Sequence, residues 1–323
     1  MQGARLLLTA AFICAASTPV LAVEGPSAAG PIGGTDIRSA VLPPPGLYGG
    51  VILLGAEAFD FVDGNGETIP ALRTAHLAKQ IAGPFLYAVP DAKVLGGSIG
   101  LGFIIPIGNQ CAHLFIGEPR NCTSGVGDPY AEIDWSHSFG KLRPSKFPGA
   151  YPILQGLTIL VGFGMVFPGV TYDASTPLQQ ALSISNNIWD FAPTAGFTYT
   201  TPPILADGTE ISVRFFWNNY IENRDTHYQT GDLLDLEFAV SERIGRFQVG
   251  VTGFYAFQVE DDELFGVPIP PDGRRGKNAQ LGPIVNFDMP AHNSSVKIKA
   301  LTTVVTENTV KAWAVVFGWI KKF

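Results

Sequence analysis

The chain has 323 residues, of which 46% are hydrophobic and only 15% are charged, and its formal net charge is −7. This length fits one or two domains, and the lack of a basic excess excludes a nucleic-acid-binding protein. The mean hydropathy of +0.21 is high for a soluble protein. No apolar run after residue 22 reaches the ~18 residues of a spanning helix, so the composition favours a closed β-barrel in a membrane.

The first 22 residues have the pattern of a secretory signal peptide. Arg5 supplies a positive charge, an apolar stretch follows from Leu6 to Ala16, and a small-residue cleavage site ends at Ala22. We therefore predict that the protein is exported. Residues 23–45 are rich in Gly, Pro, Ser and Ala, and we expect them to form a periplasmic leader without a core of its own. The alternative is that this leader plugs the barrel from below.

From residue 46 onward, apolar residues alternate with polar or small ones, which predicts β-strands with two different faces. In the stretch 95–107, for example, Leu101 and Phe103 alternate with Gly100 and Gly102. Strands of about 10 residues or more match the length of a tilted strand that crosses a bilayer. Twelve strands are expected, at 47–61, 74–89, 93–107, 128–139, 153–168, 188–201, 209–224, 232–243, 246–260, 279–289, 295–306 and 311–323.

The connections between these strands alternate in length. Short ones fall at 91–92, 244–245 and 291–294, and long polar ones at 108–127, 169–187 and 261–278. Short turns on one rim and long loops on the other are typical of outer-membrane barrels. We predict an all-β fold over 46–323: a transmembrane antiparallel up-and-down barrel in the outer membrane of a Gram-negative bacterium. A soluble β-sandwich also alternates, but its strands are usually shorter.

Two cysteines follow the signal peptide, Cys111 and Cys122. In an exported protein we expect them to form a disulfide, which would restrict the predicted loop at 108–127. A metal site would need further ligands, and only His113 is close in sequence. We therefore expect neither a metal ion nor a cofactor.

The polar faces of the strands are predicted to line the barrel lumen, where we place the candidate site residues. These residues are Glu132, Asp134, Arg214, Asn218, Glu222, Asp235, Glu237, Gln258, Lys297 and Lys299. Two interpretations remain open. The charges could neutralise one another and hold the strands in register, or the cations could oppose carboxylates to narrow a path for solutes.

The chain ends in the segment KAWAVVFGWIKKF, in which Trp313, Phe317 and Trp319 share one face of a strand. We predict that this face contacts lipid, with Lys321 at headgroup level, where its side chain can snorkel. Phe317, Trp319 and the terminal Phe323 are similar to the signal by which the barrel-assembly machinery recognises its clients.

Six stretches of the sequence resemble the outer-membrane barrel family described as MetA-pathway of phenol degradation. They are LPPPGLY, VLGGSIGLGFIIP, GVGDPYAEIDWSHSFG, NRDTHYQTGDLLDLEFAV, VGVTGFYAFQVEDDE and GRRGKNAQLGP, and the likeness extends from about residue 43 to residue 323. The matching motif positions include Gly127, Asp128, Pro129, Tyr228, Gly231 and Asp232. The resemblance implies a monomeric channel that passes small hydrophobic or aromatic compounds.

We therefore expect a passive channel that does no covalent chemistry. Its expected partners are outer-membrane lipids, the barrel-assembly machinery and small hydrophobic or aromatic solutes. Pro283, which cannot donate to a ladder, marks a possible lateral opening. Two alternatives remain: a structural or adhesive barrel with a closed lumen and partner-binding loops, and an envelope lipid-modifying enzyme, which would need a Ser–His or Asp–His pair at its outer rim.

Overall fold

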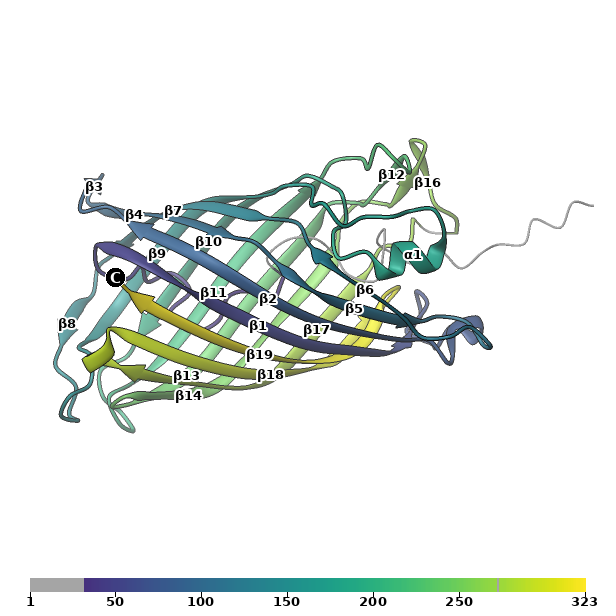
Figure 1. The fold of residues 1–323 in the computed structure, drawn as a ribbon. Helices are drawn as coiled ribbons and strands as arrows, with labels where there is room; N and C mark the ends of the chain where they lie inside the picture. Colours follow the sequence, from purple (N-terminus) through teal and green to yellow (C-terminus); the bar gives the residue numbers. More distant parts are fainter. Residues whose placement is uncertain (1–31, 272) are drawn as a thin grey trace, which may run out of the picture.

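The computed structural model describes residues 32–271 and 273–323. The predicted signal peptide and residues 23–31 lie outside these ranges. Within them the chain forms one closed antiparallel barrel of twelve wall strands (Figure 1). No helix in this part of the chain is long and apolar enough to cross a membrane.

Two of the twelve wall strands are each divided into two elements. The wall consists of β1 (Gly46–Phe61), β2 (His76–Val89), β4 (Gly97–Ile104) continued by β5 (Ile107–His113), β6 (Asn121–Val126) continued by β7 (Tyr130–Ser138), β9 (Ile153–Val166), β10 (Asp190–Thr200), β11 (Gly208–Tyr220), β13 (Leu233–Ile244), β14 (Phe247–Gln258), β17 (Lys277–Met289), β18 (Ser294–Glu307) and β19 (Val310–Lys322). The remaining short elements are β3 (Lys93–Val94), β8 (Lys141–Arg143), β12 (Tyr228–Gln229), β15 (Glu263–Leu264), β16 (Val267–Pro268), the helix α1 (Pro177–Leu182) and the 3₁₀ turns η1 (Pro70–Leu72) and η2 (Pro290–His292).

The barrel closes where the last strand pairs with the first. The register between β1 and β19 runs from Tyr48–Lys322 to Phe61–Val310, with one bulge between Ala58 and Asp60. Closure leaves no open sheet edge around the wall. The predicted fold class is thus confirmed, and the predicted strand boundaries lie within a few residues of the observed ones, except around residues 108–127.

Successive side chains of each wall strand point alternately outward and inward, as β19 illustrates. Trp313 and Val315 are each 42% exposed on the outer face, whereas Ala312 and Ala314 are buried on the inner face. Other strands carry exposed apolar side chains on the outer face in the same way, among them Leu53, Val161, Phe215, Val251, Val285 and Ile298. The outside of the barrel is therefore an apolar belt, as expected for a wall that contacts lipid.

The two ends of the barrel differ in their connections (Figure 1). At the short-turn end β1 begins, β19 ends, and the hairpin between β13 and β14 turns through Gly245. Gly245 has φ +61°, and a Cβ there would meet the Phe147 side chain at 2.8 Å, so this turn requires glycine. At the long-loop end lie the segment 167–189 with α1, the segment 221–232 with β12, and the segment 259–276 with β15 and β16.

The predicted loop at 108–127 is in fact a hairpin, so that prediction was wrong. β5 and β6 pair from Ile107–Val126 to Ala112–Asn121. Cys111 lies directly opposite Cys122, and the two form a disulfide. The segment reads as a polar loop because the hairpin projects beyond the apolar belt, where backbone pairing continues but no apolar face is needed.

Candidate functional site

The lumen of the barrel contains a stretch of the chain's own N-terminal region. Residues 32–45 lie inside the barrel and lead to the start of β1 at the short-turn end. We favoured a periplasmic leader over 23–45, with an inner plug as the alternative, and the position of residues 32–45 corresponds to the alternative. We call this stretch the lumen segment. Its polar groups are held by side chains of β10, β11, β13, β14, β17 and β18, as follows.

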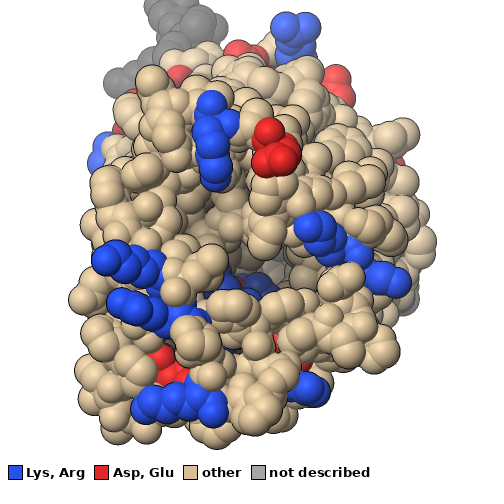
Figure 2. Space-filling view, turned by 90° about the vertical axis from the view of Figure 1, so that its left-hand side faces the viewer, with Lys and Arg blue, Asp and Glu red and all other residues tan. Residues whose placement is uncertain are grey.

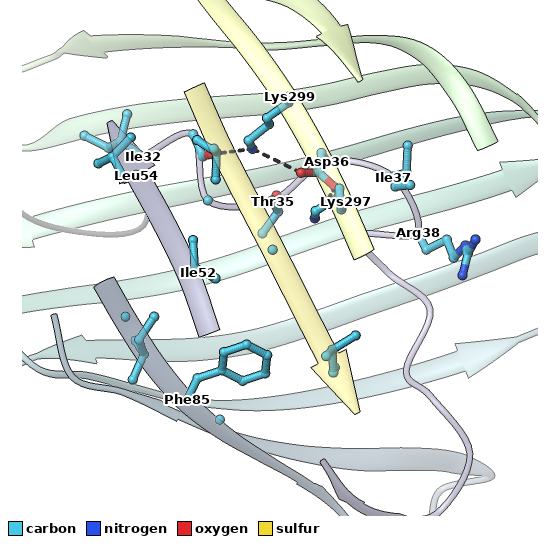
Figure 3. A pocket seen from close by; sticks show the side chains of 18 of the residues that line it. Ile32, Thr35, Asp36, Ile37, Arg38, Ile52, Leu54, Phe85, Lys297 and Lys299 are labelled. Atoms are coloured by element: carbon cyan, nitrogen blue, oxygen red, sulfur yellow. Dashed lines mark hydrogen bonds and ion pairs between the residues drawn. The ribbon is translucent and has the colours of Figure 1, made fainter. Parts of the chain in front are cut away.

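Asp36 is the most deeply buried charged group of the lumen segment, at 2% exposure. Its carboxylate accepts hydrogen bonds from Lys297 Nζ at 2.7 Å and from Lys299 Nζ at 3.0 Å. Lys299 Nζ also donates to the Gly33 carbonyl at 2.7 Å. Figure 3 shows Asp36 turned toward the two lysines of β18. Charge-assisted bonds of this kind are the stronger class of hydrogen bond.

Further polar contacts fix the lumen segment on both sides of Asp36. Glu237 of β13 accepts hydrogen bonds from the Gly34 amide at 2.8 Å, from the Thr35 amide at 2.5 Å and from the Thr35 hydroxyl. Arg38 pairs with Asp288 at 3.1 Å and donates to Gln248 at 2.9 Å.

Two amides complete the attachment. The Arg38 amide donates to Glu210 at 2.7 Å, and the Ala40 amide donates to the Thr198 hydroxyl at 3.1 Å. The lumen segment is therefore anchored along its length to one side of the barrel, which we call the polar wall and which comprises the inner faces of β10, β11, β13, β14, β17 and β18.

A second charged cluster on the inner surface does not involve the lumen segment. The Arg214 guanidinium contacts Glu132 at 3.2 Å, Asp134 at 2.9 Å and the Thr194 hydroxyl at 3.0 Å. These groups come from β7, β10 and β11, so the cluster ties three wall strands together. The Arg214 contacts correspond to the first of our two interpretations, mutual neutralisation. Lys297 and Lys299 instead form ion pairs with Asp36 of the lumen segment.

The opposite side of the lumen is apolar. Inward-facing residues of β1, β2, β4 and β19 form this apolar wall: Ile52, Leu54, Ile81, Phe85, Ile104 and Val316. Figure 3 labels three of them, Ile52, Leu54 and Phe85. Lys79 of β2 also lines this side. Between the apolar wall and the lumen segment lies a cavity of about 1520 Å³. A solute in this cavity would contact carbon on one side and polar groups on the other.

Helix α1 covers the cavity at the long-loop end. Ala181 and Leu182 pack into one apolar cluster with Phe61, Leu77 and Ala112 from the long-loop ends of β1, β2 and β5. The Gln110 side-chain amide donates to the Ala181 carbonyl.

The turn formed by Gly127, Asp128 and Pro129 holds this cover in place. Asp128 accepts hydrogen bonds from the Gly169 amide at 2.7 Å, the Ser185 hydroxyl at 2.5 Å and the Asn186 amide at 2.7 Å. The role of this motif is therefore to anchor the segment 167–189.

The short-turn end is hollowed at its centre and surrounded by basic side chains (Figure 2). Lys322 lies at this end, where its Nζ donates to the Pro45 carbonyl at 2.6 Å and lies 5.7 Å from the centre of the Tyr48 ring. Exposed cations on the same end include Lys93, Lys141, Arg143, Lys146, Arg246 and Lys321.

Nine of the ten candidate lumen residues lie on the inner surface of the wall, and Glu222 has another position. Glu222 follows the end of β11 at Tyr220 and is 45% exposed, where it contacts His227 Nδ1 at 2.8 Å. Its placement in the lumen was wrong because the strand ends before it. Gln258 lies at the outer end of β14 and accepts from the Gly276 amide at 2.6 Å, so it anchors a loop.

The other motif residues also organise the long-loop end. The Tyr228 hydroxyl and the Gly231 amide donate to Asp262 at 2.5 Å and 2.9 Å. Asp232 accepts from Trp217 Nε1 at 2.9 Å. These contacts hold the segments 221–232 and 259–276 against each other.

The wall is not open at Pro283. The pairing between β17 and β18 skips from Leu281–Thr302 to Ile284–Lys299. The strands nevertheless stay in close contact, because a Cβ on Gly282 would lie 1.7 Å from the Ala300 carbonyl oxygen. The structure therefore offers no lateral opening at this proline.

Sequence reasoning left the lumen segment as an alternative that it did not favour, and it missed the apolar wall. The charged residues of 23–45 are Glu24, Asp36 and Arg38. A charged pair two residues apart in an otherwise uncharged stretch was the signal available. The apolar wall gave no such signal, since inward apolar residues on β1 and β2 blur the alternation.

The family model described as "Putative MetA-pathway of phenol degradation" matches residues 58–318. The chain belongs to this family. No curated protein matches the sequence.

Among solved structures, the barrel is similar to the COG4313 outer membrane channel from Pseudomonas putida F1, with a TM-score of 0.71 and 12% identity over 89% of this chain and 98% of that one. Weaker similarity is found to the NanC porin (TM-score 0.40, 6% identity, 84% of this chain and 99% of that one). The translocator domain of the autotransporter NalP from Neisseria meningitidis also matches (TM-score 0.43, 8% identity, 88% and 91%).

Proposed function

We propose that this protein is a monomeric outer-membrane channel for the passive uptake of small hydrophobic or aromatic compounds. The observation that carries the proposal is the two-sided lumen, in which an apolar wall faces a cavity of about 1520 Å³. Small-molecule sites in proteins are mostly apolar with a few placed polar groups. The fold shared with the Pseudomonas putida channel and the family membership support the same function.

A solute would enter at the long-loop end, which we assign to the cell exterior, and leave through the hollow at the short-turn end, which we assign to the periplasm. Helix α1 and the lumen segment both restrict this route. The segment occupies the polar wall, so the free part of the cross-section is bounded by Ile52, Leu54 and Phe85. An apolar solute loses less hydration there than an ion or a sugar.

Flux into liposomes tests this proposal. Purified protein in liposomes should accelerate the influx of a small aromatic compound over empty liposomes, with little effect on a sugar of the same size. The variant Leu54→Asp/Ile81→Asp should lower aromatic influx by about tenfold, because a charge on the apolar wall carries bound water into the path. Gln280→Glu is the matched control, since Gln280 lines the same cavity on the polar wall. Aromatic influx equal to that of empty liposomes would refute the proposal.

A closed structural or adhesive barrel is the second candidate, and one observation favours it. Both α1 and the lumen segment lie in the path, as they would in a barrel that serves only to present its loops. The flux experiment separates the two candidates, because a closed barrel passes neither the aromatic compound nor the sugar.

The geometry gives no support to an envelope enzyme. In the described part of the chain His76 contacts Glu57, His137 contacts the Gly96 carbonyl and His227 contacts Glu222. None of these contacts joins a histidine to a serine nucleophile.

A further inference from the structure

A second, smaller cavity adjoins the main one beside residues 39–43 of the lumen segment. It measures about 230 Å³ and is lined by that stretch and by inward-facing side chains of β2, β7, β9, β11 and β19. Phe85, Tyr87 and Glu132 line both cavities, so the two are neighbours. We call the smaller cavity the side chamber. Since an apolar cavity of about 150 Å³ can bind benzene, the side chamber has room for one six-membered ring with a substituent.

Glycines on the inner face of β4 make room for one side of this chamber. Tyr87 of β2 is paired with Gly102, and its side chain lies over the β4 glycines. A Cβ on Gly100 would lie 2.0 Å from the Tyr87 hydroxyl, and a Cβ on Gly102 would lie 3.1 Å from the Tyr87 ring. The Tyr87 hydroxyl donates to Asp134 at 3.3 Å. The glycines of this strand therefore let a tyrosine of the neighbouring strand reach the charged cluster around Arg214.

Most of the lining of the side chamber is apolar. A charged group of either sign would have to give up its hydration against such a lining, at a high cost in free energy. An uncharged ligand avoids this cost. The apolar residues make up six of the eleven that line the chamber, and they are Val41, Leu42, Pro43, Phe85, Leu160 and Ile320.

Two polar groups of the chamber can bind a further partner, Glu132 and Ser39. The Glu132 side chain is 17% exposed, against 1% for Asp134 and 5% for Arg214. It accepts from the Tyr130 hydroxyl at 3.0 Å and from Arg214 at 3.2 Å, and a carboxylate has about four acceptor positions. The Ser39 hydroxyl is buried and has no hydrogen-bond partner in the described part of the chain, whereas most buried polar atoms are paired.

The charge of Glu132 decides which polar group can bind beside it. The carboxylate repels an anionic group and favours a hydrogen-bond donor. We propose that the side chamber binds small uncharged ring compounds that carry one hydroxyl group. The hydroxyl donates to Glu132 and accepts from Ser39, while the ring contacts the apolar lining. This inference rests on the proposed function and narrows its solutes to alcohols, in preference to hydrocarbons and carboxylates of the same size.

Calorimetric titration of the full mature barrel in detergent, corrected for the same micelles without protein, tests this inference. The probes are benzyl alcohol, toluene and benzoate, which share one carbon skeleton. Benzyl alcohol should bind the wild type about tenfold more tightly than either of the others, because only its hydroxyl can donate to a charged acceptor.

Two variants identify the groups that bind the hydroxyl. Glu132→Gln should weaken the binding of benzyl alcohol about tenfold, because its hydrogen bond loses the charged acceptor, and should strengthen the binding of benzoate, because the repelling charge is gone. Ser39→Ala should weaken benzyl alcohol about threefold and leave toluene unchanged. Glu67→Gln, which removes a charge from the exposed loop between β1 and β2, is the matched control and should bind all three probes like the wild type.

A misfolded barrel would lose all three probes, so opposite shifts of benzyl alcohol and benzoate in Glu132→Gln report the chamber itself. Equal affinities of the wild type for benzyl alcohol and toluene would overturn the inference, and so would an unchanged affinity of Glu132→Gln for benzyl alcohol. The liposome experiment separates this result from the proposed function. Influx of aromatic compounds without preferred binding of benzyl alcohol overturns the side chamber alone, whereas preferred binding without influx overturns the channel alone.

Discussion

Asp36→Asn is the substitution that tests most directly how the lumen segment is held. It keeps the shape of the side chain but removes the charge that Lys297 and Lys299 contact at 2.7 Å and 3.0 Å. The side chain of Lys299 is only 3% exposed, so its buried ammonium would lose the one carboxylate with which it forms an ion pair. Breaking a buried pair in this way costs about 3–5 kcal/mol. Since 1.4 kcal/mol is a factor of ten, local opening of the lumen segment should become about a hundredfold more frequent or more.

Hydrogen exchange measures this opening residue by residue. Four amides of the lumen segment report it, those of Gly34, Thr35, Arg38 and Ala40, because each donates to a wall side chain. In Asp36→Asn their exchange should accelerate by about two orders of magnitude. Exchange in the wall strands should stay unchanged. In planar bilayers the same variant should show more frequent openings to a larger conductance.

Asp173→Asn serves as the control for this experiment. Asp173 lies in the outer segment 167–189, where it accepts from the Ser175 amide at 2.8 Å, far from the lumen segment in its contacts. Removing the Asp173 charge should leave the exchange rates of the four lumen-segment amides unchanged. If exchange of these amides in Asp36→Asn stays within twofold of the wild type, the ion pairs with Lys297 and Lys299 do not hold the lumen segment, and the reasoning is refuted.

Two further predictions concern the outer loops and the C-terminus. Burial raises the pKa of Asp262 from 3.8 to about 7, so the loop contacts should be most stable below about pH 4 and should weaken as the pH rises through 7; hydrogen exchange of the Gly231 amide should follow this change, and Asp262→Asn should abolish the dependence. Phe323→Ser, or one residue added after Phe323, should reduce the amount of barrel assembled in the outer membrane without changing refolding in detergent, and an unchanged amount of heat-modifiable barrel would contradict the prediction.

The wall of the barrel could be predicted from the sequence because its rules are local. Alternation with period two places Trp313 and Val315 on one face and Ala312 and Ala314 on the other, and the structure has them there. Such a pattern needs only the geometry of a single strand and an apolar surrounding. The same local rules located the turns, so the twelve strands and both kinds of rim followed.

The same rules failed where the polarity of the side chains does not indicate whether the backbone is paired. In 108–127 the side chains are polar, yet β5 and β6 pair and are joined by the Cys111–Cys122 disulfide. Glu222 shows the converse error, because its polar alternation continues past the end of β11 into a loop. The extent of the β5–β6 hairpin and the end of β11 are both set by how far the partner strand extends. Alternation within one strand does not reveal this.

Which groups the candidate site residues contact is decided by the tertiary structure. The sequence by itself placed Lys297 and Lys299 in the lumen, but their partner is Asp36, which is more than 260 residues away along the chain. A short stretch rich in Gly and Pro has no periodicity that could reveal such a contact. Only the closed barrel brings the two lysines, Glu237 and Asp288 to one inner side, and that arrangement draws residues 32–45 inside and leaves the apolar wall free.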